Sequence, residues 1–203
     1  MKVKVSILSF AFLLNIYCYA QDSPNDNLVK WDESEKIEWD HFFVKEGPGR
    51  FAAECHTFFK ANFYLENDSV FCQIVTYLNK DSSWRKPGLK KDDPYNINHE
   101  QVHFDITEIF ARKIRKHLIE YPVNEQDVKK VYFANAKECR RFQESYDKET
   151  RHSLDRKKQV EWNIKIQHLL AGLNDFREQA IFIENPWCKL CWKDMPRAEH
   201  TRK

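Results

Sequence analysis

The sequence predicts an α+β domain in which a small antiparallel sheet is followed by three helices. Two neighbouring segments are rich in aromatic and β-branched residues and flank a polar turn. Three later segments repeat apolar residues at intervals of three and four, which is typical of helices with one buried face. About 180 residues remain once an N-terminal export signal is set aside, which suits one domain with a single core.

The first twenty residues have the pattern of a secretory signal peptide. Lys2 and Lys4 precede an apolar stretch at 5–17, and cleavage after Ala20 fits the small-residue preference of signal peptidase. A lipoprotein signal acylated at Cys18 is a weaker alternative, because the residues before it are unsuitable for lipidation. The apolar stretch is also shorter than the ~20 residues of a spanning helix. We therefore expect an exported protein, periplasmic or extracellular, with no membrane span.

Charge and cysteine content describe the mature chain further. Without the two lysines of the signal, 31 basic residues face 31 acidic ones, so nothing indicates a nucleic-acid partner, and we expect a monomer. An exported chain meets oxidising conditions that favour disulfides, and its odd number of cysteines leaves at least one unpaired within the chain. The mature cysteines are Cys55, Cys72, Cys139, Cys188 and Cys191. The first two are expected on neighbouring strands, in a register that the sequence does not fix.

Both ends of the mature chain are expected to lie outside the fold. The segment 21–30 is polar and without periodicity, which predicts a flexible leader. The segment 185–203 combines tryptophan, proline, cysteine and charged residues and predicts an irregular extension. Its Cys188 and Cys191 have redox or metal spacing, but no strand-to-helix context surrounds them. A disulfide, within the pair or to Cys139, is the preferred interpretation.

We expect the folded domain to span 31–184 and to contain a hairpin. Segments 52–65 and 70–78 predict two antiparallel strands, with Glu66-Asn67-Asp68 as the turn between them. A polar loop at 80–94 ends the strand region.

Three helices are predicted after this loop. The first spans 97–119 and ends before Pro122, because proline cannot continue a helix. The second spans 124–146 and the third about 154–170. Four cationic residues at 112–116 are interpreted as a solvated face of the first helix.

The first helix carries the motif His99-Glu100-Gln101-Val102-His103. Residues four apart on a helix lie one turn apart on the same face, so the imidazoles of His99 and His103 can bind one metal ion. Glu100 then lies beside the attacking water and can take its proton as general base. The motif is typical of zinc hydrolases and predicts a zincin-like domain. Two histidines without a metal are the alternative interpretation.

A catalytic zinc ion requires a third protein ligand and an open position for water. The first helix offers no further ligand, since Glu108 is expected on its far side. The cluster 146–152 joins the second and third helices, where a chain reversal can bring side chains back over the first. We favour His152 as the third ligand, with Asp147 as the next candidate.

Three side chains are candidates for supporting roles. Asp105 and Asp147 could accept hydrogen bonds from the ring N–H groups of the ligand histidines, which usually need such a partner. Ordinary surface or capping roles are the alternatives. Tyr146 could donate a hydrogen bond to the negative charge that develops on the substrate oxygen, or lie in the core.

These motifs resemble a family of uncharacterised secreted bacterial proteins that are described as predicted zinc-dependent proteases. The resemblance extends from about Trp39 to Leu170 and includes Ser83-Trp84. Its most distinctive parts are the run from Asn98 to Arg115 and the later Tyr146-Asp-Lys-Glu-Thr-Arg-His152. The family pattern has glycine where this chain has Val102 and Ser153. The resemblance implies a zinc site with His99, His103 and His152 as ligands and Glu100 as base.

The sequence therefore predicts an exported zinc-dependent hydrolase, specifically a metalloprotease with a peptide or protein substrate. A non-catalytic binding module in which zinc braces the helices is the first alternative. A zinc amidase acting on cell-wall peptides is the second, and it would use the same site.

Overall fold

The structure is a computed structural model that describes residues 26–47, 51–66, 69–89, 94–121 and 125–184. They form two small sheets, which are mainly antiparallel, and three long helices, which confirms the predicted α+β class. The predicted signal peptide, the C-terminal extension and the cysteine pair in that extension lie outside the described residues.

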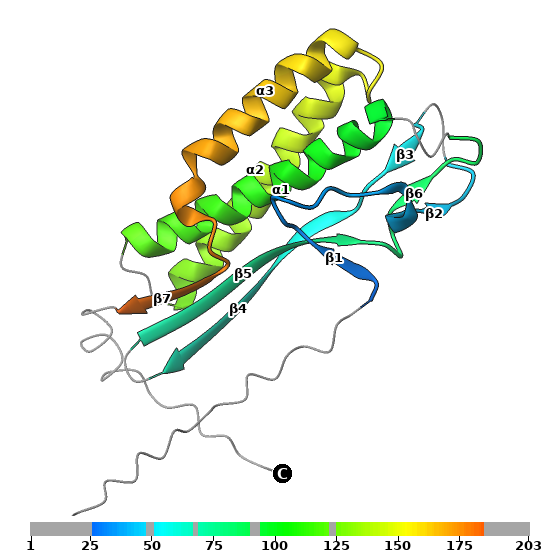
Figure 1. The fold of residues 1–203 in the computed structure, drawn as a ribbon. Helices are drawn as coiled ribbons and strands as arrows, with labels where there is room; N and C mark the ends of the chain where they lie inside the picture. Colours follow the sequence, from blue (N-terminus) through cyan, green and yellow to red (C-terminus); the bar gives the residue numbers. More distant parts are fainter. Residues whose placement is uncertain (1–25, 48–50, 67–68, 90–93, 122–124, 185–203) are drawn as a thin grey trace, which may run out of the picture.

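The larger sheet is built on the predicted hairpin (Figure 1). Strands β4 (Thr57–Glu66) and β5 (Ser69–Asn79) pair antiparallel over the whole length of β4. Strands β1 (Leu28–Lys30) and β7 (Ala180–Glu184) pair antiparallel with β5 on its other edge, at opposite ends of the strand. Among the described strands β4 pairs with β5 alone, so one edge of this sheet has no strand beside it.

The second sheet is smaller and leads into the first. Strand β6 (Trp84–Arg85) pairs in parallel with β2 (Phe43–Val44) and antiparallel with β3 (Ala53–Glu54). A short 3₁₀ helix η1 (Trp39–His41) precedes β2. Because β3 ends just before β4 begins, this sheet fixes the point at which the chain enters the edge strand.

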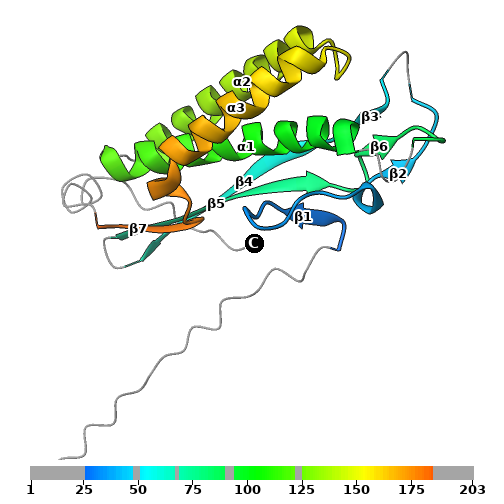
Figure 2. The ribbon, with the colours of Figure 1, turned by 45° about the horizontal axis from the view of Figure 1, so that its top comes forward.

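The three helices lie on one face of the larger sheet (Figure 2). Helix α1 (Pro94–Glu120) packs against β4, β5 and β7, and α2 (Glu125–Thr150) and α3 (Arg156–Gly172) pack on its other side. Asp155 caps α3 by accepting a hydrogen bond from a backbone N–H of its first turn. Helix η2 (Asn174–Phe176) then connects α3 to β7. The three predicted helices are thus confirmed.

Helix α1 lies at the centre of the domain and is buried on every side from His99 to Arg112. The main core cluster around it includes Phe59, Cys72, Ile74, Val102, Ile106, Ile109, Phe110, Ile114, Leu118, Tyr146, Trp162 and Ile166. Polar side chains on a helix in this position are costly unless the protein itself supplies their hydrogen-bond partners. No helix of the described residues has the length and hydrophobicity needed to cross a membrane.

The two ends of the domain differ from the prediction. Residues Leu28–Lys30, expected in a flexible leader, form β1, because their backbone pairs with β5 and Val29 packs against the cluster around Trp31. Strand β7 was not predicted, because five residues after a helix carry little periodicity of their own. Both strands depend on β5 for their pairing, which a local pattern does not reveal.

The cysteines of the described residues are not paired. Cys55 lies before β4 rather than in it, and Cys72 pairs across the hairpin with Phe63. Cys55, Cys72 and Cys139 are all free thiols. Burial raises the pKa of the Cys72 thiol to about 12, so this cysteine acts as an apolar core residue.

The cationic segment of α1 is not the solvated face that the sequence predicted. Arg112 and Arg115 are only 1% and 0% exposed, and their Nε and Nη2 atoms donate to Oε1 of Glu108 at 3.0 and 2.5 Å. The hydroxyl of Thr76 on β5 donates to Oε2 of Glu108 at 2.8 Å. Glu108 therefore faces away from the histidines, as expected, and anchors α1 to the sheet. Lys113 and Lys116 are partly exposed.

Replacing Glu108 with alanine is expected to destabilise the domain strongly. The change leaves two buried guanidinium groups without their counter-charge, which costs about 3–5 kcal/mol of unfolding free energy. Urea unfolding followed by circular dichroism measures this loss. The matched control is Glu138→Ala, which removes an ion pair to Lys113 from a side chain that is 63% exposed and should cost about 1 kcal/mol or less. Equal losses in the two variants would contradict this account of the core.

Candidate metal centre

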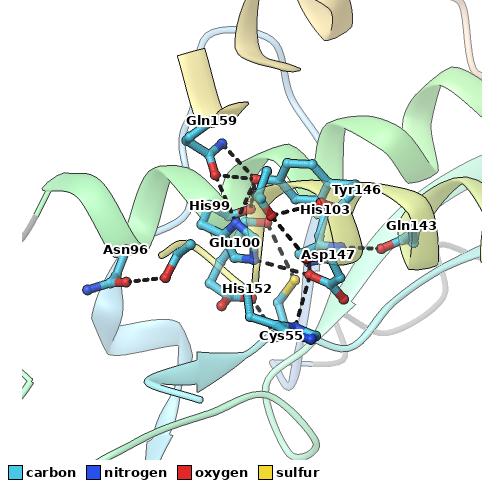
Figure 3. A network of polar contacts seen from close by, with 12 residues as sticks. Cys55, Asn96, His99, Glu100, His103, Gln143, Tyr146, Asp147, His152 and Gln159 are labelled. Atoms are coloured by element: carbon cyan, nitrogen blue, oxygen red, sulfur yellow. Dashed lines mark hydrogen bonds and ion pairs between the residues drawn. The ribbon is translucent and has the colours of Figure 1, made fainter. Parts of the chain in front are cut away.

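Two helices bring a histidine pair and a carboxylate together (Figure 3). His99 and His103 lie one turn apart in the first half of α1, and Asp147 lies in the last turn of α2. The Nε2 atoms of His99 and His103 are 3.3 and 3.0 Å from Oδ1 of Asp147. One ligand atom from each residue lies within 4.8 Å of the others. This group could hold a metal ion.

The donor separations fit a small divalent cation. Two ligands of a tetrahedral zinc ion, each bonded at about 2.0–2.1 Å, lie about 3.3 Å apart. The two measured nitrogen–oxygen separations, 3.3 and 3.0 Å, are close to this value. The residues present therefore suit a metal ion in both donor type and spacing.

The electrostatics of the group also favour a cation. Burial acts to raise the pKa of Asp147, but the hydrogen bonds and charges of His103 and His99 hold it well below its usual range. Burial acts to lower the pKa of His103, but Asp147 and Glu100 raise it above the usual value. The partly buried carboxylate of Asp147 thus stays ionised between two imidazoles and stabilises positive charge placed there. A divalent metal ion supplies such a charge.

Gln143 fixes the orientation of the His103 ring. Its Oε1 lies in hydrogen-bond contact with Nδ1 of His103, and its Nε2 donates to the hydroxyl of Thr107 at 3.1 Å. Because the amide nitrogen is engaged by Thr107, the amide oxygen faces the imidazole and accepts the proton of Nδ1. The Nε2 atom of His103 faces Oδ1 of Asp147 at 3.0 Å and donates its proton to that carboxylate. A metal ion bound between the two histidines and Asp147 would take the place of this proton.

Gln159 of α3 fixes the orientation of the His99 ring. Its Oε1 lies 2.9 Å from Nδ1 of His99, and its Nε2 donates to Oδ1 of Asn163 at 2.9 Å. The hydroxyl of Tyr146, which is fully buried, lies 2.8 Å from the same Nδ1 and 2.9 Å from Oε1 of Gln159. His99 is thus contacted by side chains from α2 and α3, and His103 by side chains from α2.

Sequence reasoning missed both glutamines. Gln143 lies four residues before Asp147, so it shares the inward face of α2. The other residues on this face of α2 are mostly apolar, so a polar side chain at this spacing could have been identified as a candidate partner of the histidine pair. Gln159 has no such signal, because its contact with His99 depends on how α3 returns over α1.

Replacing either glutamine with leucine is expected to weaken zinc binding. The leucine keeps most of the volume but cannot accept the Nδ1 proton, and losing such a partner costs about 10–100-fold in metal affinity. Competition against a zinc-binding fluorophore measures this for Gln143→Leu and Gln159→Leu. Gln167→Leu, at an exposed position of α3, is the matched control and should bind zinc as tightly as the wild type. Unchanged affinity in both test variants would refute the orienting role.

Glu100 lies next to the histidine pair and is held in place by the chain before β4. Glu100 as a whole is 4% exposed, and its Oε2 accepts a hydrogen bond from the backbone N–H of Cys55 at 2.9 Å. Glu100 also lines the adjoining cleft, where its carboxylate can meet a water molecule. Burial, followed by the charge of Glu100, raises the pKa of the Cys55 thiol well above its usual value, so this cysteine stays protonated.

His152, the favoured third ligand, lies beside the metal-binding group but outside it. Its Nδ1 is 3.5 Å from Oδ1 of Asp147, and its side chain is 45% exposed, whereas those of His99 and His103 are 6% and 11% exposed. The structure therefore brings Asp147, the second candidate, together with the histidine pair.

Asp105 and Tyr146 occupy positions that change their expected roles. Oδ1 of Asp105 accepts hydrogen bonds from Trp31 and Gln101, each at 2.8 Å, on another side of α1. The expectation that Asp105 orients a ligand histidine is thus wrong, because two residues along a helix rotate the side chain by more than half a turn. The hydroxyl of Tyr146 is directed at His99 and Gln159, so it supports a ligand and does not face a substrate.

A cleft of about 710 Å³ opens beside this group, between the chain at 51–59 and helices α1 and α2. His99, Glu100, His103 and Asp147 line it. Thr57, Phe58 and Phe59 of the edge strand β4 line it as well. The carbonyl of His56 accepts from Asn79 on β5, and the carbonyl of Phe59 accepts from the hydroxyl of Tyr132 on α2 at 2.8 Å. Because backbone direction alternates along an antiparallel strand, the N–H and C=O of Thr57 face away from β5.

Comparisons of the chain with protein-family models, curated proteins and solved structures found no match. The family resemblance stays a prediction, and the function is therefore argued from the geometry of the site.

Proposed function

We propose that this chain is a zinc-dependent hydrolase of peptide or amide bonds, specifically an exported metallopeptidase. The observation that carries the proposal is the convergence of His99, His103 and Asp147 beside the Glu100 carboxylate in one cleft. Two imidazoles and one carboxylate are the protein ligands of several catalytic zinc sites, and they leave a position open for water. The same donors also bind Fe(II) in oxygenases. The neighbouring Glu100 favours hydrolysis, because a general base is what attack by water requires.

The chain's own residues supply the proton transfers of such a hydrolysis. Zinc held by His99, His103 and Asp147 would polarise the scissile carbonyl and lower the pKa of water to about 7. Glu100 takes one proton from the attacking water on its Oε1 and passes it to the leaving nitrogen, which departs as a neutral amine. The N–H of Cys55 fixes Oε2, so Oε1 keeps one orientation throughout.

The edge of β4 supports an extended chain as the substrate. The backbone groups of Thr57 face away from β5, at a residue that lines the cleft, and could pair with a peptide strand laid beside β4. Tyr132 already engages the carbonyl of Phe59, so this pairing is confined to a few residues near the metal-binding group. A short extended peptide segment meets these requirements.

A zinc-braced binding module is the second candidate function. It is favoured by the way the ligands and the two glutamines link all three helices around one buried point. A zinc amidase acting on cell-wall peptides would use the same site and differ in its substrate alone.

Metal removal tests the proposal. The purified mature chain, loaded with zinc, is assayed on fluorogenic peptides and on cell-wall muropeptides. We expect cleavage that is abolished by 1,10-phenanthroline and restored by zinc, with about one zinc ion per chain by elemental analysis, because the three ligands define one site. Cleavage of muropeptides alone would select the amidase. A purified chain that retains no zinc would contradict the proposal.

A further inference from the structure

The turn between α2 and α3 has an unusual backbone. Arg151, His152 and Ser153 have φ angles of 53°, 52° and 67°, a left-handed region that residues with a Cβ rarely adopt and almost never in succession. Two residues at the start of α1 hold the turn: Asn96 accepts a hydrogen bond from the Ser153 hydroxyl at 2.9 Å, and Tyr95 donates to the Ser153 carbonyl. Strain of this kind persists only where surrounding contacts over-determine it, and it concentrates at functional sites.

The consequence of this turn is the position of His152. Its side chain lines the same cleft as Glu100 and Asp147, and its ring contacts the ring of Phe51 edge-on with centroids 4.4 Å apart. Phe51 belongs to the chain before β4, so this contact joins the two walls of the cleft. Unlike the two ligand histidines, His152 has no side-chain amide among its described contacts. It is exposed and placed beside the metal-binding group.

The contact with Asp147 determines what the His152 ring offers to a ligand. Nδ1 of His152 lies 3.5 Å from Oδ1 of Asp147, so this nitrogen faces the metal-binding group. Nε2, the other ring nitrogen, can accept a hydrogen bond from an N–H group through its lone pair. Among the contacts of His152 with the described residues, the one with Asp147 is made by Nδ1, and none is made by Nε2.

We propose that His152 is a substrate-binding residue whose Nε2 accepts a hydrogen bond from an amide N–H of the substrate chain, and that it is not a metal ligand. The inference rests on the proposed hydrolase function. An extended peptide presents N–H groups alternately on its two sides. The groups on one side pair with Thr57 of β4, and a group on the other side faces the wall that carries His152.

Binding of two hydroxamates to the zinc-loaded full chain tests this inference without an activity assay. Acetohydroxamate binds the metal with almost no other contact, whereas an N-acetyl-dipeptidyl hydroxamate adds amide N–H groups. Calorimetry should show that His152→Ala lowers the affinity for the dipeptidyl compound about tenfold, as expected for one lost hydrogen bond. Its affinities for acetohydroxamate and for zinc should stay at the wild-type values.

Three further variants separate the side chain from the turn. His152→Gly suits the positive φ and should show the same loss as His152→Ala, which assigns the effect to the imidazole. His152→Gln keeps an acceptor and should recover part of the affinity. His168→Ala, at an exposed position of α3, should bind both compounds like the wild type.

The possible outcomes distinguish the inference from the function on which it rests. Loss of zinc in His152→Ala would overturn the inference by making His152 a ligand, as would equal affinity of wild type and variant for the dipeptidyl hydroxamate. A wild-type chain that binds zinc but neither hydroxamate would overturn the proposed function, and the inference with it.

Discussion

Replacing Glu100 with glutamine is expected to lower kcat for peptide cleavage by about 10²–10⁴-fold, the usual contribution of a general base. Glutamine keeps the size of the side chain and can still contact the Cys55 N–H through its amide oxygen. It cannot take a proton from water, so the chemical step fails while the site stays assembled. The measurement compares kcat, KM and zinc content of the wild type and Glu100→Gln.

The zinc content of this variant separates the competing functions. An enzyme should lose turnover while zinc affinity and unfolding free energy stay near the wild-type values. The matched control is Glu161→Gln, which changes an exposed glutamate of α3 that pairs with Lys158 and should leave kcat unchanged. If Glu100→Gln cleaved peptides as fast as the wild type, Glu100 would not be the base, and the zinc-braced binding module would be the better account.

Replacing Asp147 with alanine is expected to abolish tight zinc binding. The change removes one of three protein ligands, and its effect should exceed the roughly 10–100-fold loss that follows removal of a ligand's hydrogen-bond partner. It also removes the partly buried negative charge that favours a cation between His99 and His103. Zinc affinity is measured by competition with a chelating fluorophore, and circular dichroism verifies that the variant is folded.

The variant His152→Ala provides the comparison for the Asp147 prediction. His152→Ala should bind zinc within a few-fold of the wild type, because His152 lies outside the metal-binding group. The reverse order of effects, with zinc lost in His152→Ala and kept in Asp147→Ala, would assign the third ligand to His152, as the sequence suggested.

The helices and the metal motif could be predicted because both depend on local spacing. Apolar residues at intervals of three and four define α1, α2 and α3, and the four-residue spacing of His99 and His103 fixes their common face. The hairpin was predicted for the same reason, since its two strands flank a short polar turn. In each case the information lies within about one element of the chain.

The remaining features depend on contacts between elements. The end of α2 and the three left-handed residues after it place Asp147 closer than His152 to the histidine pair, and apolar periodicity does not encode this arrangement. The sequence predicted Arg112 and Arg115 on the surface. In the structure both are buried, and they donate to Glu108 and to the backbone carbonyls of Leu170 and Arg177. Asp105 was expected to orient a histidine close to it in the sequence, whereas its partner Trp31 lies 74 residues away.

A crystal structure of the zinc-loaded chain, with anomalous diffraction recorded at the zinc edge, tests the metal centre most directly. We expect one anomalous peak at about 2.0–2.2 Å from Nε2 of His99, Nε2 of His103 and a carboxylate oxygen of Asp147. His152 should lie beyond bonding distance of that peak. A peak bonded to His152 in place of Asp147, or no peak between the two histidines, would contradict the account.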